Sequence, residues 1–134
     1  MSQESLNIVI RGMEAAFARP EPDFTVLGEV YAADHVLVPS AEMVEAEVRG
    51  ASGFRAWREE TRELLGAEHE LRGAVDVGSG TVLAVTSTRF KGSASGLASE
   101  ERLWNVVTLV GGKITRTRVY RDPAEALAAV GQSR

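Results

Sequence analysis

Residues 102–131 read RLWNVVTLVGGKITRTRVYRDPAEALAAVG, and this stretch decides the fold. Two runs rich in Val and Thr flank a Gly-Gly pair, a pattern that predicts a β-hairpin with a tight turn. Asp122 then precedes Pro123, and Glu125 follows at the spacing of a capping box, so these residues predict the start of a helix. Gly131 is expected to end that helix. The C-terminal part of the chain is therefore predicted to be strand, turn, strand and capped helix.

Apolar periodicity and turn residues predict the elements that come before. Helical spacing predicts a helix over residues ~4–18 and a shorter one near residues 24–31. We expect a strand over 35–39 with a short alternating partner over 44–48, and then a third helix that Ser52 caps and Gly66 ends. Glycine-rich turns at 78–80 and 92–96 divide the rest into strands over ~68–77, ~81–91 and ~97–110, followed by the last strand. Helices that precede an antiparallel meander are expected to pack on one face of a strongly curved sheet, which makes an α+β fold.

The last hairpin resembles the C-terminal end of the nuclear transport factor 2-like, or ketosteroid isomerase-like, superfamily, and in particular its SnoaL-like branch. In both, a Gly-Lys-Ile turn, here starting at Gly112, leads into a last strand that ends in Tyr-x-Asp, here Tyr120 to Asp122. The likeness in the order of elements extends along nearly the whole chain. It implies the cystatin-like cone of that superfamily, a curved antiparallel sheet with the N-terminal helices packed on its concave face. It also implies a pocket between these helices and the sheet.

Composition narrows the classes of function. At 134 residues the chain can bury one core, so we expect a single SnoaL-like domain over residues 1–134. A net charge of -4 argues against a general nucleic-acid binder, whose surface would be strongly basic. The sequence has no cysteine, which excludes disulfides, thiol catalysis and thiolate metal sites. No apolar run reaches membrane-spanning length and the first residues lack a signal-peptide pattern, so we expect no membrane partner and a cytoplasmic location.

Strand alternation predicts which side chains face the pocket. Together with two aromatic residues from the second and third predicted helices, the expected ligand-binding residues are Tyr31, His35, Trp57, Leu103, Asn105, Val107, Thr117 and Val119. This set predicts a mostly apolar pocket for a small apolar molecule, although ordinary core positions are the competing interpretation, for Trp57 above all. Asn105 differs from the rest, because an inward amide in a Val-rich strand needs a hydrogen bond from a ligand, water or a neighbour. Leaving such an amide unpaired costs ~1–3 kcal/mol.

The resemblance also locates the positions at which enzymes of the superfamily carry their catalytic groups. Comparison with the ketosteroid isomerases places Pro39 at their general-base Asp and Asn105 at the protonated Asp of their oxyanion hole. Residues 13–17 lie near the place of their Tyr donor and contain no Tyr. Comparison with the SnoaL-like polyketide cyclases and the limonene-epoxide hydrolases places Val119 at their acid/base Asp. Proline and valine side chains cannot transfer a proton, so the resemblance implies that neither mechanism is intact.

Two histidines remain as candidates for proton transfer. His35 shares strand parity with Pro39 and has an ordinary pKa near neutrality, so it is a candidate base, whereas its place at the start of a strand favours a solvent-exposed side chain. His69 has no visible partner. The sequence contains no His-x-x-His or His-x-Glu pattern, so we expect no metal site. We also expect no cofactor, because the glycine-rich turns precede strands and therefore lack the helix N-terminus of a phosphate cradle. Asp122 is explained by its role as an N-cap.

The opposite strand parity predicts an interface between two copies of the chain. Trp104 and Val106 point outward on one strand, and Arg116, Arg118 and Tyr120 point the same way on the next. Apolar and aromatic side chains beside guanidinium groups are typical of protein interfaces, and the superfamily commonly dimerises through this sheet face. We therefore expect a homodimer. Scattered surface residues are the competing interpretation.

Three functions stay open at this point. We favour a non-catalytic binder, which needs only the apolar lining and Asn105 to orient its ligand. An isomerase, cyclase or hydrolase of a hydrophobic carbonyl or polyketide-like compound would use Asn105 to polarise an oxygen, and His35 or an acid such as Glu101 to move a proton. An interaction module would work through the outer sheet face with its pocket packed shut. Fold membership cannot decide between them, because function depends on the site.

Overall fold

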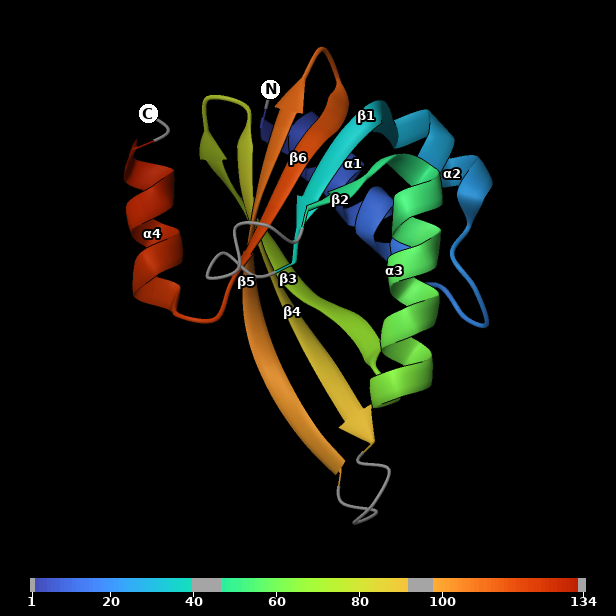
Figure 1. Ribbon diagram of the computed structural model, residues 1–134. Helices are drawn as coiled ribbons and strands as arrows, with labels where there is room; N and C mark the ends of the chain where they lie inside the picture. The colour runs from blue at the N-terminus through green and yellow to red at the C-terminus, as the bar shows by residue number, and fades with distance from the viewer. Residues whose placement is uncertain (1, 40–46, 92–97, 133–134) are drawn as a thin grey trace.

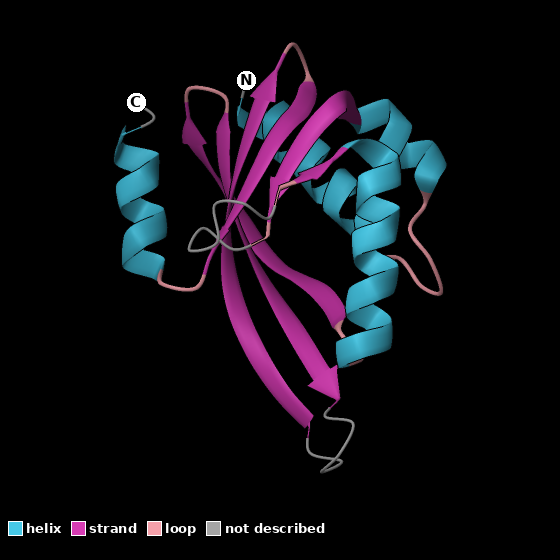
Figure 2. Ribbon diagram, in the orientation of Figure 1, coloured by secondary structure: helices cyan, strands magenta, loops and turns pink. Residues whose placement is uncertain are grey.

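A computed structural model describes residues 2–39, 47–91 and 98–132. In chain order the elements are α1 (Ser2–Ala16), α2 (Phe24–Val30), β1 (Tyr31–Val38), β2 (Val48–Arg49), α3 (Gly50–Leu65), β3 (Glu68–Gly78), β4 (Thr81–Lys91), β5 (Ala98–Val110), β6 (Lys113–Tyr120) and α4 (Pro123–Gln132). This is the order of helices and strands that the sequence predicts. Figures 1 and 2 show α1, α2 and α3 on one side of the curved sheet, which we call the inner face, and α4 on the other side, the outer face.

The sheet has the strand order β2-β1-β6-β5-β4-β3. Strands β3 to β6 form the predicted antiparallel meander, in which Asn105 lies opposite Ala84 on one side and Val119 on the other. Strand β1, however, pairs with β6 in the parallel direction, with Leu37 opposite Thr117. The sheet is therefore mixed, whereas an antiparallel sheet was expected from the sequence. The α+β class, with a curved sheet and the N-terminal helices on its inner face, is confirmed.

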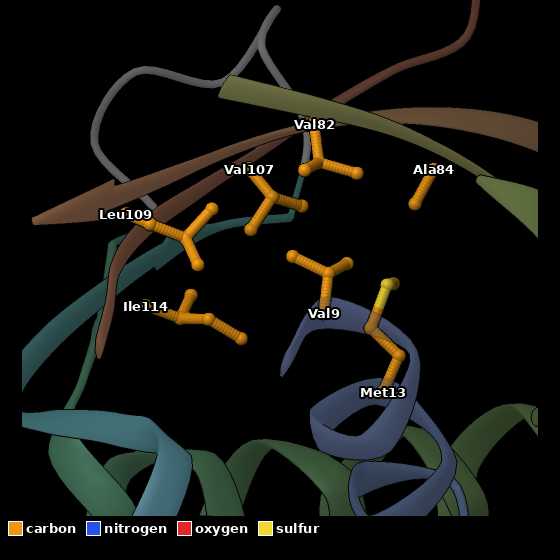
Figure 3. Packing of buried hydrophobic residues seen from close by; sticks show 7 residues of the cluster. All are labelled: Val9, Met13, Val82, Ala84, Val107, Leu109 and Ile114. Carbon is orange, nitrogen blue, oxygen red and sulfur yellow. The ribbon is translucent and has the colours of Figure 1, made fainter. Parts of the chain in front are cut away.

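The main hydrophobic core lies between α1 and the inner face of the sheet (Figure 3). Val9 and Met13 of α1 point at a buried layer made by Val82, Ala84, Val107, Leu109 and Ile114. Gly12 brings α1 close to the sheet, because a Cβ atom at that position would lie 3.0 Å from the Ile114 side chain. Removing this layer from water stabilises the packing of α1 on the sheet and fixes where the adjoining cavity begins.

A second, smaller core lies on the outer face, under α4. Ala126 and Val130, four residues apart on α4, pack against Val106, with Trp104 and Tyr120 half-buried beside them. The expected exposed patch on the outer face is therefore partly covered by the chain's own C-terminal helix. The sequence contained the signal for this contact, since an i, i+4 apolar pair gives a helix one face that must be buried.

The predicted ends of the elements are partly confirmed. Gly66 ends α3 in the left-handed region, with a φ of 62°, and the Asp122 carboxylate accepts a hydrogen bond from the Ala124 backbone N–H at 2.8 Å, at the start of α4. Two other predictions were wrong. Helix α3 begins at Gly50, so Ser52 lies inside it and cannot cap it, and α4 continues through Gly131 to Gln132.

Two of the expected segments fall on residues outside the described ranges. The strand predicted over 44–48 overlaps the described chain only near β2, which begins at Val48. The turn predicted at 92–96 lies outside the described residues altogether. In the ranges that the structure describes, no helix is long and apolar enough to cross a lipid bilayer.

Candidate binding cavity

A cavity of about 440 Å³ lies between the helices and the inner face of the sheet, next to the α1 core. The helices contribute mostly apolar side chains to its wall, among them Leu27 of α2 and Phe54 of α3. The strands contribute both apolar and polar side chains, and the polar ones include Tyr31, His35, His69, Thr86, Asn105, Lys113 and Thr117. A cavity of this size with a few polar groups on one wall has the usual character of a small-molecule site.

Most of the predicted ligand-binding residues are brought together here. The structure places seven of the eight in the cavity wall, namely Tyr31, His35, Trp57, Leu103, Asn105, Thr117 and Val119. The eighth, Val107, lies in the core instead, where it is 1% exposed and packs with Val9 and Met13 of α1. Val107 shares the inner face with Asn105, but α1 covers that end of β5. Strand parity therefore identified the face correctly and could not tell how far along the strand the cavity extends.

Asn105 is buried in the cavity wall, with 4% of its surface exposed. Its side-chain Nδ2 donates to the Ala84 carbonyl oxygen at 3.1 Å and to Thr86 Oγ1 at 3.0 Å. Both bonds bridge from β5 to the neighbouring strand β4, so the amide is held in one orientation by the sheet itself. The predicted need for hydrogen bonds is thus met by neighbours on the donor side of the amide.

His35 is buried, although a solvent-exposed side chain was expected. Its Nε2 lies 3.1 Å from Thr117 Oγ1, and its ring meets the Tyr31 ring edge to face with the centroids 4.7 Å apart. Burial lowers the pKa of the His35 imidazole to about 4, against a smaller opposing effect of the Asp34 carboxylate. Burial also raises the pKa of the Tyr31 phenol. Both side chains are therefore neutral at pH 7. The prediction failed because β1 starts at Tyr31, four residues earlier than expected, so His35 lies inside the strand.

His69 also lines the cavity, and the sequence analysis missed it. Its Nδ1 lies 2.9 Å from Thr88 Oγ1 on β4, and its ring stacks on Trp57 of α3 with centroids 5.6 Å apart and lies near Phe17 at 5.2 Å. Burial is the main reason that the pKa of this imidazole falls to about 4, and the nearby Arg58 guanidinium lowers it further. The available signal was parity, since positions 69 and 71 alternate inward on β3, with Leu71 against the core.

The guanidinium of Arg58 fixes α3 over the cavity. Arg58 is 2% exposed and donates to the backbone carbonyl oxygens of Ala16, at the end of α1, and of Ala18, the latter at 3.2 Å. Its Nη2 atom lies 4.0 Å from a carboxylate oxygen of Glu68 on β3. One side chain thereby ties α3 to the end of α1 and to the sheet. This contact positions Trp57, the preceding residue, against His69.

The cavity wall contains no carboxylate among the described residues. Pro39 and Val119, the positions at which the resemblance placed catalytic acids, are both in the wall. Glu101, the acid considered as an alternative, lies outside the wall and pairs with Arg121 at 3.3 Å. Lys113 is the one lining residue of the described chain with a permanent charge; it is exposed, and its Nζ donates to the Glu29 carbonyl oxygen at 3.1 Å. Within the described ranges, no three His, Cys, Asp or Glu side chains are grouped to hold a metal ion.

Comparison with known proteins shows which solved structures share this fold. No protein-family model and no curated protein matches the sequence. Among solved structures, a protein from a soil-derived mobile gene cassette shares 15% identity at a TM-score of 0.72, over 96% of this chain and 97% of that one. A putative SnoaL-like polyketide cyclase from Jannaschia sp. CCS1 shares 14% identity at a TM-score of 0.71, over 96% and 92%. A nuclear transport factor 2-like protein from Burkholderia xenovorans LB400 shares 23% identity at a TM-score of 0.69, over 97% and 98%.

The chain shares its fold with solved SnoaL-like and nuclear transport factor 2-like proteins. The predicted resemblance is confirmed at this level. Identities of 14–23% show a shared fold only. The chemistry must therefore be inferred from the residues of this cavity.

Proposed function

We propose that this protein binds a small, mostly apolar molecule in the inner-face cavity, with uncharged polar groups on the strands orienting it. The observation that carries this proposal is the cavity itself, about 440 Å³ in volume, with Asn105 and Thr117 in an otherwise largely apolar wall. An interaction module whose pocket is packed shut would not need this space. A ligand with a planar apolar body would contact the aromatic side chains of Phe54 and Trp57.

The two tryptophans of the chain allow a direct test. Trp57 lines the cavity, whereas Trp104 lies on the outer face under α4. A titration with biphenyl, followed by the two indole N–H signals in ¹H–¹⁵N NMR spectra, should shift the Trp57 signal and leave the Trp104 signal in place. The Trp104→Phe variant assigns the two signals and is the matched control. Unchanged signals at a saturating biphenyl concentration, or a shift of Trp104 alone, would contradict the proposal.

Catalysis is a second candidate, favoured by one observation. Two neutral imidazoles, His35 and His69, share the cavity wall with Asn105, and a neutral imidazole can accept a proton. An enzyme of this kind should exchange the methyl protons of 4-acetylbiphenyl with D₂O faster than buffer does, and His35→Gln should reduce that rate. Exchange at the buffer rate in the wild-type protein would leave binding as the function.

We also propose a homodimer and a cytoplasmic location. The exposed apolar surface that supports the dimer is smaller than the sequence indicated, because α4 covers Val106. The half-buried Trp104 remains, with Val75 and Leu127 about 60% exposed. Light scattering should give about twice the 14.4 kDa chain mass, and Trp104→Glu should halve it, while Leu64→Glu on α3 should not. A wild-type monomer at tens of micromolar would contradict the dimer proposal. The cytoplasmic location is tested separately by cell fractionation.

A further inference from the structure

The orientation of the Asn105 amide in the cavity wall is imposed by β4. A backbone carbonyl oxygen can only accept a hydrogen bond, so the contact of 3.1 Å with the Ala84 carbonyl requires the NH₂ end of the amide. Thr86 Oγ1 accepts a second bond from the same nitrogen at 3.0 Å. Both N–H groups of Asn105 are therefore used within the sheet. No described residue donates to Oδ1, which is left as an acceptor in the cavity wall.

Thr86 supplies the opposite half of a hydrogen-bonding pair. Its Oγ1 accepts from Asn105, and among the described residues its hydroxyl proton has no acceptor. Thr86 is 2% exposed and lies in the cavity wall, so a group inside the cavity can accept that proton. Asn105 and Thr86 together present one free acceptor and one free donor on adjoining strands.

We propose that the cavity selects a ligand that carries an uncharged hydroxyl group, which donates to Asn105 Oδ1 and accepts from the Thr86 hydroxyl. This inference rests on the proposed binding function. A hydroxyl group both donates and accepts, so it satisfies both protein groups at once. A ketone or ether oxygen can only accept a hydrogen bond. It would leave Asn105 Oδ1 without a donor, facing a lone pair of the ligand oxygen. Asn105 therefore selects a hydrogen-bond donor, and the expectation that its amide polarises a substrate oxygen is reversed.

The charges around the cavity favour a neutral hydroxyl over an ionised one. His35 and His69, the titratable imidazoles of the wall, are uncharged at pH 7 because burial holds their pKa near 4. The ammonium group of Lys113 lies at an exposed part of the wall, where it donates to the Glu29 carbonyl oxygen. A phenolate or carboxylate placed against Asn105 would thus have no opposite charge there to compensate for its loss of water. The ligand class is a phenol or an alcohol on an apolar, ring-containing body.

Three probes with the same body separate this inference from the proposed function. They are 4-hydroxybiphenyl, 4-methoxybiphenyl and biphenyl, titrated by ligand-detected NMR at pH 7.5. We expect 4-hydroxybiphenyl to bind about 3–10-fold more tightly than 4-methoxybiphenyl, the ratio that one or two net hydrogen bonds produce. Equal affinities of the two would overturn the inference and leave the binding function standing. Failure of all three to bind would overturn the binding function, and the inference with it.

Substitutions on β4 and β5 show whether the selectivity resides in the two named groups. Asn105→Leu should bring the affinity ratio of the two oxygenated probes close to one. Thr86→Val should reduce the ratio and Thr86→Ser, which keeps the hydroxyl, should restore it, so the test survives if Asn105→Leu fails to fold. Thr81→Val makes the same chemical change at a buried position of β4 outside the cavity and should leave the ratio unchanged. A hydroxyl preference that persists in both Asn105→Leu and Thr86→Val would also overturn the inference.

Discussion

Lowering the pH from 7.5 to 5.0 is expected to destabilise this protein through His35 and His69. Burial lowers the pKa of each imidazole from its ordinary value of 6.5 to about 4 in the folded state. In the unfolded chain each takes up a proton near pH 6.5, so below that pH the unfolded state binds more protons than the folded state. The free energy of unfolding therefore falls as the pH falls through 6.5, and the loss levels off below about pH 4.

The size of the effect follows from the same pKa values. Each imidazole lowers the free energy of unfolding by about 2 kcal/mol at pH 5.0, and by about 3 kcal/mol once the pH is below 4. The two together remove about 4 kcal/mol at pH 5.0, a large part of the roughly 5–15 kcal/mol that stabilises an ordinary domain. These are the only histidines in the sequence, so no other imidazole can contribute.

Urea unfolding at constant ionic strength, followed by circular dichroism at both pH values, measures this difference. His35→Gln and His69→Gln each keep a group that can bond to Thr117 or Thr88, and each should remove about half of the pH dependence. The double variant should lose only a small fraction of its stability between pH 7.5 and 5.0. The reasoning would be refuted by a wild-type protein that is equally stable at both pH values, or by a double variant that still loses several kcal/mol.

Two further predictions concern chemistry and packing. The purified protein should not convert a steroid enone into its conjugated isomer, measured by ultraviolet absorbance, because Pro39 cannot supply the general-base contribution of ~10²–10⁴-fold; fast turnover would show that Pro39 does not occupy the base position. Arg58→Met should lower the free energy of unfolding by about 2–4 kcal/mol, since it removes the hydrogen bonds to Ala16 and Ala18 and leaves Glu68 with fewer partners. Arg11→Met, at the exposed pair with Glu29, is the control and should cost under about 1 kcal/mol. Equal losses in the two variants would contradict the anchoring role of Arg58.

Local patterns predicted the order of the elements and the face of most cavity residues. Glycine turns and β-rich runs identify the hairpins that form β3 to β6, and period-two alternation then assigns Asn105 and Val119 to one face of the sheet. The same reasoning could not separate Val107 from the cavity, because the boundary is set by where α1 lies along β5. That position depends on close packing at Gly12 and Met13, which is a tertiary contact.

The remaining failures have the same physical origin. His69 was dismissed because its partners, Thr88 and Trp57, come from a neighbouring strand and a distant helix, and a single strand's pattern contains neither. The parallel docking of β1 on β6 also depends on the path of the chain through α2 and has no hairpin signal. On the outer face, the apolar side of α4 was visible in the sequence, but not the surface that it covers.

The separation of roles in the cavity wall makes this protein a convenient scaffold for changing ligand preference. The groups that would orient a ligand belong to strands joined by backbone pairing, whereas the lining residues Leu27, Phe54 and Trp57 belong to helices. A combinatorial library at those three helical positions would alter the size of the accepted molecule without disturbing the amide of Asn105. The sheet would then keep its hydrogen-bonding groups unchanged, while the helices would determine which ligand sizes fit.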